Sequence, residues 1–315
     1  MKVSFRIGPA VVVLTWDPPP MSLRHEMISH FQIDDVIPAI DDVIPAQAGI
    51  RSPPDLALRI RSDTAPVELG LSLVGEYEAS WRLFRRTEGW RLEILYPGES
   101  LRVKQVALIS REFNQIDLHL SSRSDWRLED VMEPLVQWWL TGWLTLRKKG
   151  LMFHGSAVVR EKSGLAFIGP SGAGKTTLAQ LCLDQKESGW TVLNDERIVV
   201  WKEADGWRVG GTPWPGMLMK VSPVTAPLAG LFLLKKTAEN RTVSVSPMRF
   251  LTQLIPEAFH PIWSREAVEG LLETADRLVE QVPHGEFHFI KDSSAVDFLE
   301  GFLQRSCAPS LTISP

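Results

Sequence analysis

The chain has 315 residues and a formal net charge of −4, a balance that gives no electrostatic support to nucleic-acid binding. With 44% apolar residues it can bury a core, and its length predicts two domains, or one domain with extensions. The two cysteines lack Cys-x-x-Cys spacing, which argues against a disulfide framework or a zinc site and favours a cytoplasmic location.

The first 55 residues contain a tandem repeat. The heptapeptide IDDVIPA occurs at 33–39 and again at 40–46, and two copies are too few for a solenoid. Prolines crowd the same segment, at positions 18, 19, 20, 38, 45, 53 and 54. We therefore expect residues 1–55 to be a poorly ordered leader.

Residues 56–128 alternate short apolar and polar stretches, which is typical of β-structure. The stretches 81–85 and 90–95 flank a Thr-Glu-Gly turn and predict a β-hairpin, and residues 116–120 predict another strand. This segment is expected to form a small β-rich domain, and it contains no recognisable catalytic pattern.

A tryptophan-rich helix is predicted to connect the two halves of the chain, over residues 129–150. Its apolar part, LVQWWLTGWLTL at 135–146, is shorter than the roughly 20 residues that cross a bilayer, so we expect no membrane span. Acidic residues precede this stretch and basic residues follow it, which suits the helix dipole. Its three tryptophans favour a buried helix, with a contact in a homo-oligomer as the alternative.

Residues 151–306 alternate predicted strands and helices. Strands are expected at 151–159, 165–168, 190–195, 198–201, 207–210, 231–234 and 286–290, and helices at 177–183, 247–255, 266–281 and 294–305. This order predicts an α/β fold with mixed strands, followed by a tail at 307–315.

A glycine-rich loop is the most specific motif of the chain. Residues 169–176 read GPSGAGKT and fit the phosphate-binding pattern G-x-x-x-x-G-K-[ST] at every position, between a predicted strand and a predicted helix. Glycines let such a loop turn its N–H groups toward one anion, and the helix N-terminus adds its dipole. We therefore predict a nucleoside triphosphate site.

The loop predicts both ATP and Mg²⁺ as cofactors. Lys175 is expected to reach the β- and γ-phosphates, and the Thr176 hydroxyl to bind Mg²⁺, with Thr177 as the alternative. The residues assigned to the nucleotide are Gly169, Ser171, Gly172, Ala173, Gly174, Lys175, Thr176 and Thr177.

Two adjacent acids end the predicted strand that follows the loop helix. Because neighbouring strand residues point to opposite faces, Asp195 and Glu196 are expected to have different duties. We assign Asp195 as a general base for a substrate hydroxyl, with metal binding as the alternative, and Glu196 to the metal. The alternative is that the two acids have no catalytic or metal-binding role and simply belong to a solvated turn or a helix cap.

His154 follows an apolar run, one strand before the loop strand. A histidine there is either a hydrogen-bonded core residue or part of the γ-phosphate pocket, and the residues alone leave both open.

The order of these motifs resembles the catalytic domain of the HPr kinase/phosphorylase family, over roughly residues 150–300. The shared features are His154-Gly155, the GPSGAGKT loop and a strand ending in Asp195-Glu196, where the family has Asp-Asp. The resemblance implies a P-loop domain with a mixed sheet like the phosphoenolpyruvate carboxykinase core. It also implies Asp195 as the acid/base, His154 and Lys175 beside the transferred phosphate, and Thr176 on Mg²⁺.

The leading functional prediction is an ATP- and Mg²⁺-dependent kinase. Its acceptor is a hydroxyl, such as a serine, on a protein, a peptide or a small molecule; residues 210–216 (GGTPWPG) replace the family's signature for protein substrate. The alternatives are a nucleotide-binding ATPase or switch and a catalytically degenerate scaffold. No LSGGQ-like or Asn-Lys-x-Asp segment occurs, as transporter ATPases or GTPases would have, and the intact Lys175, Thr176 and Asp195 favour activity.

Overall fold

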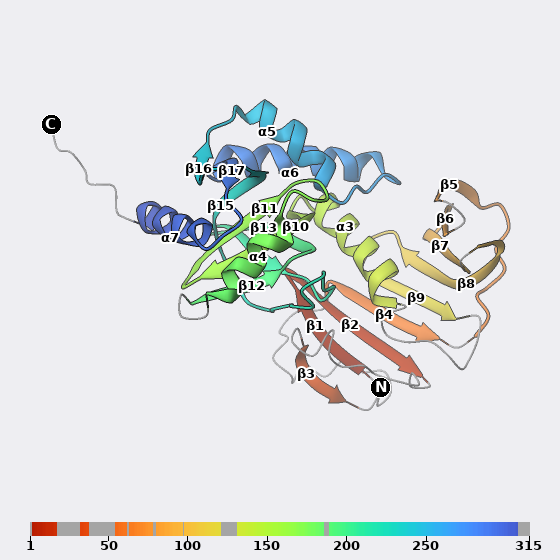
Figure 1. The fold of residues 1–315 in the computed structure, drawn as a ribbon. Coiled ribbons are helices and arrows are strands. Elements are labelled where there is room, and N and C mark those ends of the chain that lie inside the picture. The colour runs from red at the N-terminus through yellow and green to blue at the C-terminus, as the bar shows by residue number, and fades with distance from the viewer. Residues whose placement is uncertain are drawn as a thin grey trace. The chain divides into compact units, whose positions relative to one another are not determined.

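The computed structural model describes residues 2–17, 32–37, 54–61, 63–77, 80–96, 98–120, 131–185 and 189–307. The chain divides into two compact units, one of Met1–Leu146 with Pro261–Val268 and one of Arg147–His260 with Glu269–Pro315. Each unit contains a mixed β-sheet, and helices accompany the sheets, so the fold is mixed α/β (Figure 1).

The described part of the first unit contains a nine-stranded sheet. Its strands, in their order across the sheet, are β3 (Gln32–Ile37), β1 (Lys2–Ile7), β2 (Ala10–Asp17), β4 (Leu56–Arg61), β9 (Gln115–Leu120), β8 (Glu99–Ser110), β7 (Gly89–Tyr96), β6 (Trp81–Arg86) and β5 (Ser72–Tyr77). The sheet is mixed because β4 runs parallel to both β2 and β9, while the other neighbours are antiparallel.

Part of the expected leader belongs to this sheet. Residues 2–17, which we expected to be poorly ordered, instead form β1 and β2, an antiparallel pair. The physical reason is the alternation in β1, where Val3, Phe5 and Ile7 are buried on one face. Of the IDDVIPA repeat, residues 33–37 lie in β3, and residues 38–46 lie outside the described residues.

The tryptophan-rich segment is helical and belongs to the first unit. A π-helical turn, η1 (Met132–Val136), leads into α3 (Gln137–Leu146), and the residues before 131 that we included in this helix lie outside the described ones. Trp139 and Trp143 are fully buried, and the Trp139 indole N–H donates to the carbonyl oxygen of Phe113 at 2.6 Å. These two tryptophans therefore lie in the core, as predicted. No helix among the described residues has both the length and the apolar content to cross a bilayer.

The second unit contains an eight-stranded sheet in the described residues. Along the sheet lie β11 (Ser163–Ile168), β10 (Gly150–Arg160), β13 (Arg197–Glu203), β14 (Gly206–Gly211), β15 (Thr225–Lys236), β17 (His284–Phe289) and β16 (Arg241–Val243), with β12 (Trp190–Asn194) paired to β10. Because β11 also pairs with β15, the strands β11, β10, β13, β14 and β15 close into a ring. The parallel members are β11, β15 and β17.

Strand β10 changes its partners halfway along its length. Residues 150–154 pair with β13, whereas residues 155–160 pair with β11 and, from residue 157 on, also with β12. The change falls at Gly155, where a Cβ atom would meet Cδ1 of Ile168 at 2.7 Å. A larger residue here would have to displace the ends of the Ile168 and Ile198 side chains where the strand leaves β13.

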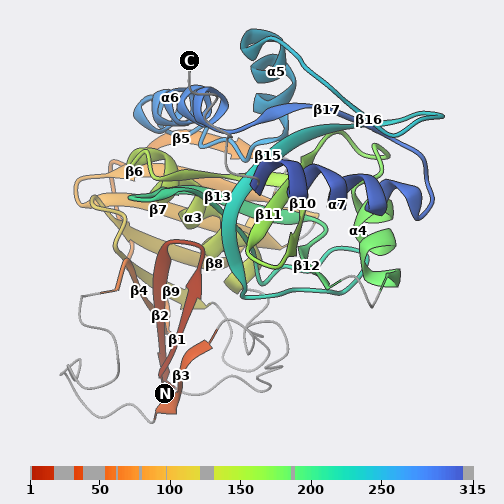
Figure 2. The same ribbon diagram turned by 90° about the vertical axis from the view of Figure 1, so that its left-hand side faces the viewer.

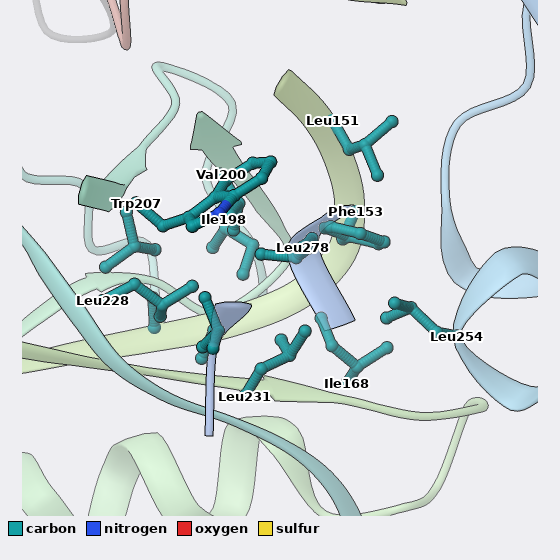
Figure 3. Close-up of a cluster of buried hydrophobic side chains, with 14 of the residues drawn as sticks. Leu151, Phe153, Ile168, Ile198, Val200, Trp207, Leu228, Leu231, Leu254 and Leu278 are labelled. Carbon is teal, nitrogen blue, oxygen red and sulfur yellow. The ribbon is translucent and has the colours of Figure 1, made fainter. Parts of the chain in front are cut away.

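Both faces of the central strands are covered, which explains why β11 is apolar at nearly every position. One core cluster packs Ala166 and Ile168 with α5 (Pro247–Leu254) and α6 (Arg265–Gln281), and Figure 3 shows its side chains converging. On the other face, Leu165 and Phe167 pack with α4 (Lys175–Asp184) and α7 (Ser294–Cys307), which lie next to each other (Figure 2).

Cys182 lies in the second of these clusters and is predicted to be chemically inert in the folded chain. Burial, together with the charge of Glu300, raises the pKa of its thiol to about 12. At pH 8 the thiolate population is then about a thousandfold smaller than for an unperturbed thiol. In a Cys307→Ser variant, a thiol reagent should label the native protein at least about a hundredfold more slowly than the unfolded protein. Equal labelling rates in the two states would contradict this.

Candidate functional site

The glycine-rich loop leaves β11 at Ile168 and enters α4 at Lys175. Gly169, Gly172 and Gly174 have φ angles of 149°, 80° and 111°, in the region that favours glycine. Gly174 is also crowded, because a Cβ atom there would lie 2.6 Å from the Phe289 ring. The loop backbone therefore depends on its glycines, as the motif predicts.

The remaining loop residues differ in exposure. Ser171 is exposed, Ala173 is half-buried, and Thr176 and Thr177 are half-buried in the first turn of α4. The loop closes on itself through the Ala173 N–H, which donates to the Pro170 carbonyl oxygen at 3.0 Å. The exposed part of the loop and the hydroxyls of the first helical turn are thus open to a ligand.

Lys175 is buried at the start of α4, and its ammonium group binds the loop itself. Its Nζ donates to the carbonyl oxygens of Gly169 and Pro170. Burial lowers the pKa of Lys175, while the carboxylates of Glu257 and Glu196 act in the opposite direction. The ammonium thus has two carbonyl partners in the loop and two carboxylates within electrostatic reach.

A second ammonium group reaches the loop from β15, and no sequence pattern predicts this contact. Lys236 ends β15, beside β11 in the parallel part of the sheet, and its Nζ donates to the Gly172 carbonyl oxygen. A lysine at a strand end is ordinarily a solvated residue, so only the parallel pairing of β15 with β11 identifies it.

The acidic pair is carried by a turn that Asn194 builds. The Asn194 side chain is fully buried; its Nδ2 donates to the Trp214 and Thr212 carbonyl oxygens at 2.9 and 3.0 Å. Its Oδ1 accepts the N–H groups of Glu196 and Arg197 at 2.7 and 2.9 Å. Asparagine is the residue type that forms such turns, so its position before two acids was the available signal.

Asp195 points into the protein, under the segment 212–218. It is 1% exposed, and its Oδ2 accepts the Leu218 N–H at 3.3 Å. Its Oδ1 has no hydrogen-bond partner among the described residues. Gly216 covers this oxygen so closely that a Cβ atom on it would lie 2.5 Å away.

Glu196 and His154 form a half-exposed pair beside the loop. The His154 Nε2 lies 3.1 Å from Glu196 Oε1, and their side chains are 42% and 34% exposed. The Gly155 N–H also donates to the Glu196 carbonyl oxygen at 3.1 Å. His154 is therefore half-exposed and paired with Glu196 rather than buried in the core.

Glu257 is a further acid at this site that sequence reasoning missed. It ends η3 (Ile255–Glu257), and the next residue, Ala258, forms an antiparallel bridge with Phe153 of β10. This register brings Glu257 level with His154, and its carboxylate is the stronger of the two that act on Lys175. Nothing in the surrounding sequence, LIPEAFH, indicates that role.

The structure brings together Lys175, Glu196 and His154, whereas Asp195 is joined by hydrogen bond to the segment 212–218. In the described part of the chain, no group of three or more His, Cys, Asp or Glu side chains could hold a metal ion alone. Mg²⁺ commonly binds through one or two carboxylates together with substrate phosphates. Thr176 and Glu196 are half-buried and carry oxygen donors, the ligand type that fits Mg²⁺ arriving with a phosphate.

Comparisons with known proteins give no assignment for this site. No family model matches the chain, and no curated protein matches it either. A function must therefore be inferred from the residues of the site themselves.

Replacing Gly216 by alanine is expected to disturb the cover of Asp195. The added methyl would overlap Asp195 Oδ1, so either the carboxylate or residues 212–218 must shift, at a cost of about 1–3 kcal/mol in the free energy of unfolding. Chemical denaturation of the variant measures this. The matched control is Gly301→Ala in α7, where the methyl meets only the end of the Arg305 side chain and stability should hold or rise. Equal stability of the two variants would contradict the prediction.

Proposed function

We propose that the chain is an ATP- and Mg²⁺-dependent phosphotransferase that transfers the γ-phosphate to a hydroxyl group of a protein, a peptide or a small molecule. One observation carries the proposal: three positive-φ glycines connect a buried strand to a helix that begins with a buried lysine. This strand, loop and helix order is what a triphosphate-binding loop requires. The likeness of the motifs to HPr kinases supports the same chemistry.

The loop would hold the phosphates by its N–H groups and by the dipole of α4. Lys175 would exchange its contacts with the loop carbonyls for phosphate oxygens, which satisfy an ammonium better because they are charged. Lys236 lies on the same loop and would add a second positive charge. When bound, Mg²⁺ would neutralise charge on the phosphates, and Thr176 and Glu196 are the residues that would hold it.

Asp195 would act as the general base. Its Oδ1 has no partner among the described residues, so it is available to accept the proton of an acceptor hydroxyl. The acceptor would reach that oxygen by displacing the segment around Gly216. His154, held by Glu196, would donate a hydrogen bond to the phosphoryl group during transfer.

A second candidate function is a nucleotide-dependent switch or ATPase without an acceptor, or a scaffold that only binds nucleotide. The burial of Asp195 favours it, because a base that is 1% exposed cannot meet an acceptor unless residues 212–218 move. Both candidate functions use the same phosphate site. They differ in whether Asp195 acts as the general base for an acceptor hydroxyl.

Nucleotide binding is tested by thermal unfolding with and without ATP and Mg²⁺. Ligand at a hundred times its dissociation constant should stabilise the wild type by about 2.7 kcal/mol, which raises the unfolding midpoint by several degrees. Lys175→Ala should abolish this increase because it removes the buried ammonium. Lys162→Ala, in the exposed turn between β10 and β11, is the matched control and should retain it. An increase of equal size in Lys175→Ala would exclude the loop as the binding site.

The duty of Asp195 is tested with Asp195→Asn, which keeps the shape of the side chain and removes the base. For a kinase, transfer of γ-phosphate to hydroxyl acceptors such as serine peptides should fall by about 10²–10⁴-fold, while ATP still raises the unfolding midpoint. Asp205→Asn, in the exposed turn between β13 and β14, should leave transfer unchanged. Unaltered transfer in Asp195→Asn would remove Asp195 from the proposed mechanism.

A further inference from the structure

Glu257 enters the site through the free edge of β10. Residues 150–154 of β10 pair with β13 on one side, and on the other side Ala258 bridges to Phe153. The Phe259 N–H extends this contact by donating to the Met152 carbonyl oxygen at 2.9 Å. Two backbone contacts therefore fix the residues that follow Glu257, and their register places Glu257 at the level of His154.

The carboxylate of Glu257 is not held by a direct side-chain contact in the described part of the chain. It takes part in no salt bridge or side-chain hydrogen bond among the described residues, and it is half-buried. The charge of Glu257 acts on Lys175 electrostatically, and the charge of Glu196 does so more weakly. The Lys175 ammonium nevertheless donates its hydrogen bonds to the loop carbonyls and not to either acid. Glu196 in turn lies against His154.

Two carboxylates therefore lie within electrostatic reach of Lys175, next to which the phosphates of a nucleotide would bind. A metal-free triphosphate would bring its own negative charges toward Glu257 and Glu196, and repulsion between like charges is strong at a half-buried site. A divalent cation between the phosphates and the carboxylates would reverse the sign of that interaction. The same two acids would then favour binding.

We propose that Glu257, together with Glu196, makes the glycine-rich loop selective for metal-loaded nucleotide: the pair repels free triphosphate and accepts its complex with a divalent cation. This inference rests on the proposed nucleotide site and assigns Glu257 a positioning and selectivity role within it. Selectivity of this kind would keep the loop from holding ATP in a form that lacks the metal needed for transfer.

The experiment compares the dissociation constant of ATP in excess EDTA with that in excess Mg²⁺, by calorimetry at constant ionic strength. In Glu257→Gln, metal-free ATP should bind about three- to tenfold more tightly than in the wild type, since one repelling charge is lost. The enhancement of binding by Mg²⁺ should shrink by at least the same factor. Glu257→Asp, which restores the charge, should move both values back toward the wild type.

Two further variants separate the possible failures. Glu280→Gln removes an exposed carboxylate of α6 and should leave both dissociation constants unchanged, while Lys175→Ala should abolish binding in both conditions. An unchanged Mg²⁺ enhancement in Glu257→Gln, or equal weakening in EDTA and in Mg²⁺, would overturn the inference while the nucleotide site stands. Wild-type ATP binding that survives in Lys175→Ala would overturn the proposed site and the inference together.

Discussion

Four consecutive residues of β10 hold the candidate site together. At the point where β10 leaves β13 for β11, Phe153 bridges to Ala258, His154 pairs with Glu196, and the Gly155 N–H donates to the Glu196 carbonyl oxygen. The next residue, Ser156, is fully buried, and its hydroxyl lies 3.5 Å from the Lys175 carbonyl oxygen at the start of α4. One strand segment therefore contacts the acidic turn, the segment after η3 and the loop helix. The arrangement of the site therefore depends on where β10 changes its partners.

The second constraint is the cost of burying charge. Lys175 and Asp195 are both almost fully buried, and an isolated ionised group in such a position is strongly disfavoured. The chain compensates each in a different way. Loop carbonyls and two nearby carboxylates offset the burial of Lys175, whereas Asp195 receives one backbone N–H and keeps one oxygen unpaired. An unpaired buried oxygen in a folded chain calls for an explanation, such as a water, an ion or a ligand that completes its hydrogen bonding.

Local sequence predicted the second unit well; in the first unit it predicted the β6–β7 hairpin and strand β9, but not β1 and β2. The glycine-rich loop and its flanking strand and helix could be predicted because glycine spacing and apolar runs act within a few residues; the short strand β16 was missed because three residues carry no pattern. Residues 2–17 were misjudged because nearby prolines and a repeat outweighed the alternation of β1. Glu257 and Lys236 could not be found at all. Each reaches the site by pairing with a strand distant in sequence, and side-chain type alone does not encode that pairing.

In the proposed function, one site would combine strong anion binding with control over what binds. The loop, the dipole of α4 and two lysines attract negative charge, and alone they would hold any phosphate. The acids set by the β12–β13 turn and by the segment after η3 oppose that attraction at close range. The groups that attract phosphate and the acids that repel it lie on different strands. The balance between them therefore depends on how β10 changes from β13 to β11, rather than on the loop motif. Chains that share the motif and lack Glu257 would bind the same phosphates with a weaker requirement for metal.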